Sequence, residues 1–163
     1  MYKIFIFTIF LIFSLSAKPT ISSVYTDFSK DCKNDPKIKD GDIPRICKGP
    51  NDYNIYISYS ACFEVLHIRK KDKILDITIP EQPLGSSDKK KLEWRLVDGQ
   101  AKGLIYRAHE MVEDPNGSCP QKKNKDLLEI RTLNPESKSE SIPSTSGANE
   151  KARELLDKLI APN

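Results

Sequence analysis

The 163-residue chain is poor in the residues that most often carry catalysis. It has two histidines, His67 and His109, and none of its serines lies in the G-x-S-x-G turn that exposes a serine nucleophile. A Ser–His–acid set depends on geometry rather than on sequence order, so it stays an alternative. The more ordinary interpretation places both histidines on sheet faces, with local hydrogen bonds. We therefore assign no catalytic residue.

The sequence also lacks closely spaced cysteines. Its four cysteines follow one another at separations of 15, 15 and 57 residues, whereas a zinc site needs pairs such as C-x2-C. The Asp-rich stretch 31–42 does not have the D-x-D-x-D-G spacing of a calcium loop. No metal ion or cofactor is predicted, with a loosely bound calcium and a reactive thiol as alternatives. An even number of cysteines instead predicts two disulfides among Cys32, Cys47, Cys62 and Cys119.

Four cysteines allow three pairings. We favour Cys32–Cys47 with Cys62–Cys119, because the segment between the first two cysteines holds two prolines, a glycine and seven charged residues and cannot bury itself. A disulfide that closes this loop should stabilise the fold by about 3 kcal/mol in the chain-entropy model. The other two pairings stay open on the sequence alone.

Long hydrophobic runs are missing except at the N-terminus. There Lys3 precedes the apolar run 4–13, and small residues follow as far as Ala17. This arrangement is typical of a secretory signal peptide over residues 1–17, and the run is shorter than the ~20 residues of a membrane span. An uncleaved anchor is the alternative. Residues 18–163 are then expected to form one secreted or periplasmic domain without a transmembrane span.

Charge of one sign is not in excess, since 26 Lys and Arg stand against 23 Asp and Glu. Nucleic-acid binding usually needs a strongly basic face, so nucleic acid is not predicted as a partner. Three basic runs fall at predicted loops and could together hold an anionic polymer or a lipid headgroup. The plainer interpretation is that they are solvated turns. The candidate anion contacts are Arg69, Lys70, Lys71, Lys89, Lys90, Lys91, Lys122 and Lys123.

Alternation of apolar and polar residues predicts strands through most of the chain. Residues 18–30 should form an extended lead-in. Residues 53–68 are predicted as one half-buried strand with a kink near Ser60, in which Phe63 and Val65 share a face with Tyr53, Ile55 and Ile57. Asp98-Gly99 is a turn dipeptide that links hairpin strands. Further strands are predicted at 74–79, 92–97, 103–112 and 126–133.

The C-terminal part changes its period. Residues 134–147 are rich in Ser, Pro and Glu and are predicted to be a loosely held linker. Residues 148–160 repeat apolar side chains at helical spacing, with Ser146 or Asn149 as the expected cap. Strands first and a helix last predict an α+β fold: a mainly antiparallel sheet or small sandwich of about five strands, stapled by disulfides and closed by one amphipathic helix.

Several short motifs, taken in order, carry a resemblance. They are YTDFSKDC (25–32), ICKGPNDYNIYIS (46–58), LEWR (92–95), GLIYR (103–107), LLEIRTL (127–133) and NEKARELLDK (149–158). In this order they resemble an uncharacterised family of small secreted or periplasmic bacterial proteins. The resemblance covers most of residues 18–163 and implies a bacterial envelope protein. It implies no activity, no cofactor and no catalytic residue.

These observations favour a non-enzymatic binding or interaction module of the envelope or the extracellular space. Its partner would be a protein or an anionic envelope polymer, and an inhibitor of a hydrolase is one concrete form. The alternative is a small secreted hydrolase that uses a histidine-based set or two strand carboxylates at glycosidase spacing. The candidate carboxylates are Glu64, Asp76, Glu93, Glu110 and Glu129.

Overall fold

The computed structural model of the chain describes residues 18–34, 45–59, 62–71, 73–83, 90–112, 115–117, 119, 123–134, 136 and 138–161, with the backbone alone for 73–83. The expected signal peptide, the Asp-rich loop after Asn34, and the candidate contacts Lys89 and Lys122 lie outside the described residues.

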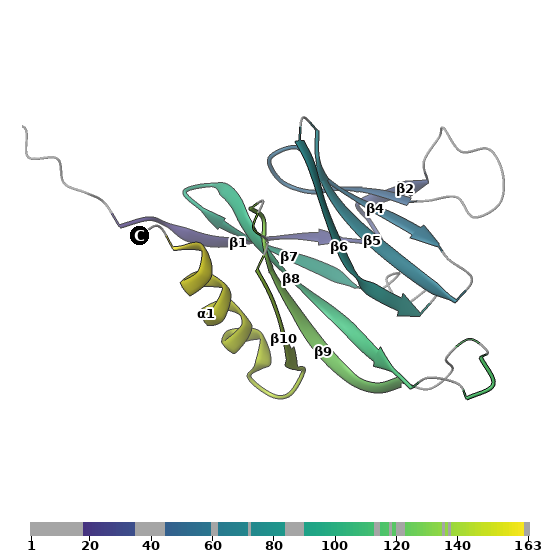
Figure 1. The fold of residues 1–163 in the computed structure, drawn as a ribbon. Helices are drawn as coiled ribbons and strands as arrows, with labels where there is room; N and C mark the ends of the chain where they lie inside the picture. The colour runs from purple at the N-terminus through teal and green to yellow at the C-terminus, as the bar shows by residue number, and fades with distance from the viewer. Residues whose placement is uncertain are drawn as a thin grey trace, which may run out of the picture.

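The described strands form two five-stranded antiparallel sheets (Figure 1). Sheet A has the spatial order β1 (Ile21–Asp27), β7 (Lys91–Val97), β8 (Gln100–Met111), β9 (Lys123–Thr132) and β10 (Ser139–Pro143). Sheet B has the order β2 (Cys32–Asn34), β3 (Arg45–Lys48), β4 (Tyr53–Tyr59), β5 (Phe63–Lys70) and β6 (Lys73–Pro83).

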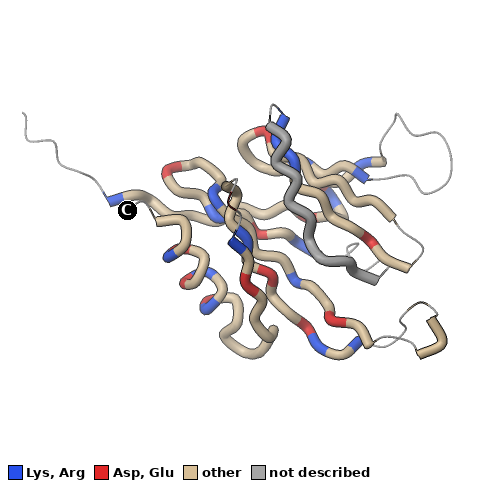
Figure 2. The backbone as a smooth tube through the Cα atoms, in the orientation of Figure 1, with Lys and Arg blue, Asp and Glu red and all other residues tan. Residues whose placement is uncertain are grey.

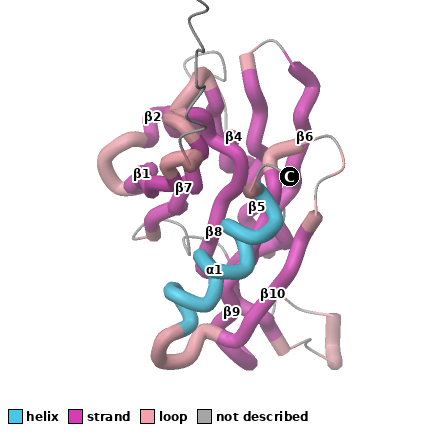
Figure 3. Tube along the Cα trace, turned by 90° about the vertical axis from the view of Figure 1, so that its left-hand side faces the viewer, coloured by secondary structure: helices cyan, strands magenta, loops and turns pink. Residues whose placement is uncertain are grey.

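The elements stack in three layers. Sheet B packs on one face of sheet A, and helix α1 (Ala148–Ile160) covers the other face, which we call the outer face. Figure 3, turned so that the helix faces the viewer, shows α1 lying across the strands of sheet A. The predicted α+β class, mainly antiparallel and closed by one C-terminal helix, is confirmed.

The main core lies between the two sheets. Trp94 and Tyr106 of sheet A are fully buried against Ile55 and Leu66 of sheet B. The indole Nε1 of Trp94 donates a hydrogen bond to Thr26 Oγ1 at 2.9 Å, so the buried N–H has an acceptor. Because both faces of sheet A are covered, β7 is buried from its second residue to its last, and its outward-facing side chains lie beneath the helix.

A second, smaller core forms between the outer face of sheet A and the helix. Ala152 and Leu156 of α1 pack there, and both are fully buried. Leu156 lies directly over Gly103, where an added Cβ would come within 2.6 Å of its Cδ1 and 3.0 Å of the Arg131 carbonyl oxygen. The close approach of helix and sheet therefore requires glycine at position 103.

The prediction of one strand over 53–68 is wrong, because the segment forms two paired strands, β4 and β5. Tyr53, Ile55 and Ile57 are buried as predicted. A chain reversal between the strands breaks the alternation, so that Glu64, Leu66 and Ile68 are buried after it, whereas Phe63 and Val65 are only half-buried.

Other segments differ from expectation in smaller ways. The predicted lead-in forms β1, and the predicted linker 134–147 contains β10, which pairs with β9. β6 continues through Pro80 to Pro83, and β10 ends in Pro143; both are edge strands in the described sheets, where proline is tolerated. The predicted Ser146 or Asn149 cap is absent: Gly147 precedes α1 in the left-handed region, with φ 75° and no side-chain cap.

The disulfides are the two that the sequence favours, Cys32–Cys47 and Cys62–Cys119. The first joins residues directly opposite each other on β2 and β3. The second ties the chain just before β5 to the connection between β8 and β9, and so crosslinks sheet B to sheet A. The predicted Asp98-Gly99 turn joins β7 and β8, with positive φ at both residues.

Candidate functional site

Two arginine–carboxylate pairs dock the helix on the outer face of sheet A. Arg153 of α1 donates to both oxygens of Glu93 on β7, at 2.8 and 3.1 Å. In the reverse sense, Arg95 of β7 donates to both oxygens of Asp157 on α1, at 2.9 and 2.5 Å. Residues two apart on a strand share a face, and so do residues four apart on a helix, so the two patterns match each other.

Strand β1 joins this network from the side. Ser23 Oγ donates to Glu93 Oε1 at 2.5 Å and accepts from Arg95 Nη1 at 2.5 Å. Arg153 Nη2 also donates to the hydroxyl of Tyr25 at 3.1 Å. The first strand of the fold, the central sheet and the last helix are therefore held together by charge-assisted hydrogen bonds.

The network shifts the pKa of Glu93. Burial favours the protonated acid, but hydrogen bonds from Arg153 and Ser23, together with the charges of Arg153 and Arg95, lower the pKa below its ordinary value. The same contact with Glu93 raises the pKa of Arg153. Both groups are therefore charged at neutral pH.

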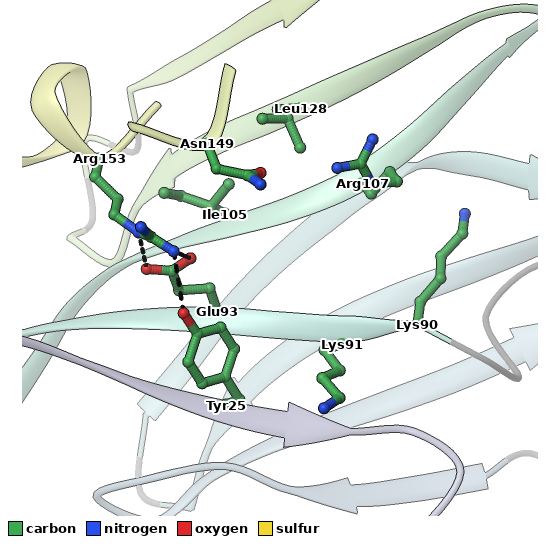
Figure 4. Close-up of a pocket in the computed structure, with 9 residues that line it drawn as sticks. All are labelled: Tyr25, Lys90, Lys91, Glu93, Ile105, Arg107, Leu128, Asn149 and Arg153. Carbon is green, nitrogen blue, oxygen red and sulfur yellow. Dashed lines mark hydrogen bonds and ion pairs between the residues drawn. The ribbon is translucent and has the colours of Figure 1, made fainter. Parts of the chain in front are cut away.

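Beside this network lies a cavity of about 340 Å³, shown in Figure 4, which we call the cationic cavity. Four of its lining residues are basic, and Glu93 is the one acidic residue among those described. The described lining consists of Tyr25, Lys90, Lys91, Glu93, Ile105, Arg107, Leu128, Asn149 and Arg153.

The basic residues of the cavity differ in how their charge is balanced. Arg153 is paired with Glu93, and Lys91 Nζ lies 3.6 Å from Asp27 Oδ2. Arg107 and Lys90 form no ion pair within the described parts of the chain; Arg107 donates instead to the hydroxyl of Ser144. Figure 4 shows their cationic ends on the same side of the cavity, opposite the Glu93–Arg153 pair. That side carries two positive charges without a carboxylate partner among the described residues.

Lys90 is the most perturbed of these bases. Its Nζ is shielded from solvent, finds no hydrogen-bond acceptor in the described structure, and lies 5.3 Å from the centre of the Tyr106 ring. Burial lowers the pKa of Lys90 to about 8, the charges of Arg107 and Lys123 act in the same direction, and Glu64 and Asp126 oppose them. At neutral pH the amine is still mostly charged, and it lacks an acceptor.

The remaining walls are neutral. Ile105 and Leu128 form an apolar patch on the sheet, and Asn149 extends from the first turn of α1 toward the cavity in Figure 4. No side chain caps the start of this helix, whose aligned peptide dipoles add positive potential there. The Tyr25 side chain is about half exposed, with 51% of its surface accessible.

The structure separates the basic residues that the sequence proposed as anion contacts. Lys90 and Lys91 line the cationic cavity, and Lys123 lies near enough to lower the pKa of Lys90 while it pairs with Asp126 at 3.1 Å. Arg69, Lys70 and Lys71 stand at the other sheet: Arg69 and Lys70 each lie 5.1 Å from the centre of a tyrosine ring of β4, and Lys71 follows β5. Figure 2 shows basic positions spread over both sheets.

The candidate carboxylates are also dispersed. Glu93 and Glu129 both belong to sheet A but face opposite sides, since Glu93 pairs in register with Ile105 beneath the helix and Glu129 with Tyr106 between the sheets. Glu129 accepts a hydrogen bond from Ser141. Glu64 is fully buried on sheet B, Glu110 pairs with Lys125 at 2.9 Å, and Asp76 lies on β6, of which only the backbone is described.

The two histidines have different surroundings. His67 lies on β5 opposite Tyr56, half-buried. His109 on β8 places its Nδ1 2.5 Å from Asp126 Oδ1. Burial and the charge of Lys90 lower the pKa of His109, although Asp126 acts in the opposite direction. The imidazole is therefore mostly neutral at pH 7.

Sequence reasoning missed six lining residues: the polar Tyr25, Arg107, Asn149 and Arg153, and the apolar Ile105 and Leu128. A usable signal was present in the charge pattern, since Glu-x-Arg at 93–95 is complementary to Arg-x3-Asp at 153–157. A strand and a helix with opposite charge order are expected to pack side by side. Arg107 gave no such signal, because a single arginine on a strand forms no charge pattern that could be compared with another segment.

Among the described residues, no cluster of His, Cys, Asp and Glu could hold a metal ion, and no helix is long and apolar enough to cross a membrane. Comparisons of the chain with protein-family profiles, curated proteins and solved structures found no match.

Proposed function

We propose that this protein is a non-enzymatic, extracytoplasmic binding module that holds an anionic group of an envelope polymer in the cationic cavity. The observation that carries the proposal is the pair Lys90 and Arg107, two cationic side chains on one side of a cavity without a carboxylate partner in the described structure.

Two like charges that share a partly buried site repel each other and are poorly solvated. Burial is the main cause of the lowered pKa of Lys90, and the charge of Arg107 adds to it. Once the Lys90 side chain turns its shielded Nζ from the Tyr106 ring toward the cavity, an anion between the two groups would accept a hydrogen bond from each and remove the repulsion. Charge-assisted hydrogen bonds of this kind are roughly twice as strong as neutral ones. The cavity is therefore better suited to a bound anion than to water.

Two further features support the setting. Both described disulfides are expected in an oxidising compartment, which agrees with the signal peptide predicted over residues 1–17. The lining residues Tyr25, Glu93, Arg107 and Arg153 also come from four of the six short motifs that resemble bacterial envelope proteins, and the fold brings those distant segments to one place.

The test is affinity electrophoresis of the oxidised protein through gels that contain phosphomannan, polygalacturonate or neutral dextran. We expect at least one polyanion to retard the protein and dextran to leave it unaffected. Lys90→Met and Arg107→Gln should each weaken the retardation about tenfold, the equivalent of one charge-assisted hydrogen bond. Lys151→Met removes the same charge from the exposed side of α1 and is the matched control.

A triple variant in which Arg69, Lys70 and Lys71 are neutralised distinguishes binding in the cavity from binding at the basic turn between β5 and β6. Retention of binding in this triple variant is the expected result. Loss of binding there, with full binding in Lys90→Met and Arg107→Gln, would locate the interaction on sheet B and refute the cavity as the binding site.

A hydrolase is the second candidate, and the His109–Asp126 contact is the specific observation that favours it. A carboxylate at 2.5 Å from Nδ1 holds an imidazole in one orientation, as in a general-base pair. A panel of ester, amide and glycoside substrates tests this candidate. Turnover that disappears in His109→Gln would replace the binding module with an enzyme, and activity unchanged in that variant would remove His109 from consideration.

A further inference from the structure

We infer that the anionic group held in the cationic cavity is a phosphomonoester carried on a sugar or another polyol. The inference rests on the proposed function and specifies the chemistry of its ligand. It follows from a count of the unbalanced charges on one side of the cavity and from the neutral, hydrogen-bonding character of the other walls.

The charge count favours phosphate over carboxylate. Lys90 and Arg107 are the two lining bases without an ion pair in the described chain, whereas Lys91 and Arg153 have Asp27 and Glu93. A carboxylate carries a single negative charge and would leave one of the two bases unbalanced. A phosphomonoester carries about −1.5 to −2 charges at pH 7, with three strong acceptor oxygens, and balances both bases.

The donors present also suit three acceptor oxygens. Arg107 uses one Nη1 hydrogen for Ser144, which leaves its Nε and Nη2 hydrogens free within the described structure. Lys90 Nζ has three hydrogens and no acceptor among the described residues. The uncapped start of α1 adds positive potential from a third direction.

The opposite side of the cavity suits hydroxyl groups rather than a second anion. Glu93 and Arg153 are already paired, so a charged group there would have to break a two-bond contact. Asn149 offers both an amide donor and a carbonyl acceptor, and Arg153 retains its Nη1 hydrogens in the described structure. Neutral hydroxyls can donate to the Asn149 side-chain carbonyl and accept from the Asn149 amide or the Arg153 guanidinium.

The size and the apolar surfaces agree with a single ring or a short polyol. A volume of about 340 Å³ stands at the lower end of the roughly 300–1,000 Å³ of small-molecule sites. Ile105 and Leu128 provide an apolar patch for the C–H face of a sugar, and the half-exposed ring of Tyr25 stands at the rim. The phosphate would lie at Arg107 and at Lys90, whose Nζ must turn from the Tyr106 ring toward the cavity, and the sugar ring would lie between Asn149 and Tyr25.

The test is an NMR titration of the oxidised protein with four probes: glucose 6-phosphate, glucuronate, inorganic phosphate and glucose. We expect glucose 6-phosphate to bind about tenfold more tightly than glucuronate and inorganic phosphate, and glucose to show no saturable shift. The largest shifts should fall on Arg107, Asn149 and their neighbours in sequence.

Three variants assign the two ends of the ligand. Lys90→Met should reduce the affinity for glucose 6-phosphate about tenfold and bring it close to that for glucuronate. Asn149→Ala should weaken glucose 6-phosphate roughly threefold and leave inorganic phosphate unchanged, since it removes a neutral hydrogen bond to the sugar alone. Lys151→Met, which loses one charge on the same helix, should match the wild type.

The pH profile gives an independent reading. Affinity for glucose 6-phosphate should be highest between about pH 6 and pH 8, because the second phosphate pKa is near 6 and Lys90 loses its proton near 8. Binding of glucuronate should lack the fall in affinity below about pH 6.

The charged groups that face Lys90 are Glu64 on β5, Arg107 on β8, and Lys123 and Asp126 on β9, with His109 beside them. Protonation of His109 would strengthen anion binding at low pH, and His109→Gln controls for it.

The outcomes separate this inference from the proposed function. Glucuronate bound as tightly as glucose 6-phosphate, or inorganic phosphate as tightly as the sugar phosphate, would overturn the inference while the cavity remained an anion site. Failure of all three anionic probes, together with failure of both polyanions in the gels, would remove the proposed function as well.

Discussion

The two sheets are held in place by different kinds of bond. Sheet B contains the Cys32–Cys47 disulfide and is anchored to sheet A by Cys62–Cys119. The outer face of sheet A depends instead on the helix, which is docked by the Glu93–Arg153 and Arg95–Asp157 pairs. Disulfides fix sheet B, whereas ion pairs that titrate fix the helix together with the small apolar core around Ala152 and Leu156.

This difference indicates where a ligand can act. A ligand that binds to sheet B meets a surface whose geometry the disulfides restrain at any pH, as long as they are not reduced. A ligand that enters the cationic cavity meets side chains whose charge depends on pH and on each other, such as Lys90 and Glu93. The proposed site thus consists of titratable side chains on the outer face of sheet A, whereas the disulfides lie in sheet B and at its junction with sheet A.

The largest expected effect comes from the covalent side. Replacement of Cys62 and Cys119 by serine opens a separation of 57 residues and should lower the free energy of unfolding by about 4 kcal/mol in the chain-entropy model. Replacement of Cys32 and Cys47, with a separation of 15 residues, should cost about 3 kcal/mol. Urea denaturation measures both. Equal losses, or a larger loss for the shorter loop, would contradict the entropic account.

The next effect tests the close approach of helix and sheet. Gly103→Val places side-chain atoms where Leu156 packs and should cost about 3 kcal/mol by overpacking. Urea denaturation of Gly103→Val, Leu156→Ala and the double variant measures the coupling between the two sites. The double variant should be more stable than the sum of the single effects predicts, because the smaller alanine removes the clash. Strict additivity would show that the helix is not held against position 103.

The arginine–carboxylate pairs should contribute less. Arg95→Met leaves Asp157 without its partner and should cost about 2 kcal/mol, whereas Lys151→Met on the exposed side of α1 should change stability by less than about 0.5 kcal/mol. Denaturant midpoints measure both variants. A loss for Arg95→Met no larger than that for Lys151→Met would show that the pair does not dock the helix.

Glu93 makes this contribution dependent on pH. Its pKa is lower in the folded than in the unfolded state, so its stabilisation is present above the ordinary value of 4.5 and disappears as the pH falls through the folded-state pKa. The stability difference between wild type and Glu93→Gln should therefore shrink on acidification from about pH 7 to pH 3. A difference that stays constant over this range would refute the linkage.

The smallest effect has the opposite sign. Lys90 is partly buried with its pKa lowered to about 8, so its charged form is less stable in the folded than in the unfolded state at neutral pH. Lys90→Met keeps the packing over Tyr106 and should raise the free energy of unfolding by about 1 kcal/mol, after allowance for solvent screening. The gain should fade as the pH rises from about 8 to 10.5, above which lysine is neutral in both states. A loss of stability at pH 7 would mean that Lys90 serves the fold rather than a ligand.

Much of the fold could be predicted from the sequence, because local patterns determined it. The helix at 148–160 and the Asp98-Gly99 turn follow from spacing and turn chemistry, and the disulfide pairing is the one that the sequence favoured among three. The division of 53–68 into two strands could not be predicted, since an alternation of apolar residues does not reveal a reversal that flips the buried face from Phe63 to Glu64.

The candidate site could be predicted only in part. Lys90 and Lys91 were identified as basic residues of a predicted loop, but nothing local shows that Arg107 lines the same cavity as Lys90. That proximity depends on the pairing of β7 with β8, which brings Leu92 opposite Tyr106. Strand register is a long-range property, and without it a lone arginine on a strand looks like any solvent-facing charge.

The cationic cavity has walls from both ends of the fold. Tyr25 belongs to the first strand, and Asn149 and Arg153 belong to the last helix. During synthesis β1 leaves the ribosome before α1, so the cavity cannot form until α1 has been made. A nascent or trimmed chain that lacks either segment lacks part of the cavity wall, even if the sandwich between them folds. Only a molecule in which both β1 and α1 are present and folded would then bind the proposed ligand. Ligand affinity would therefore depend directly on complete folding.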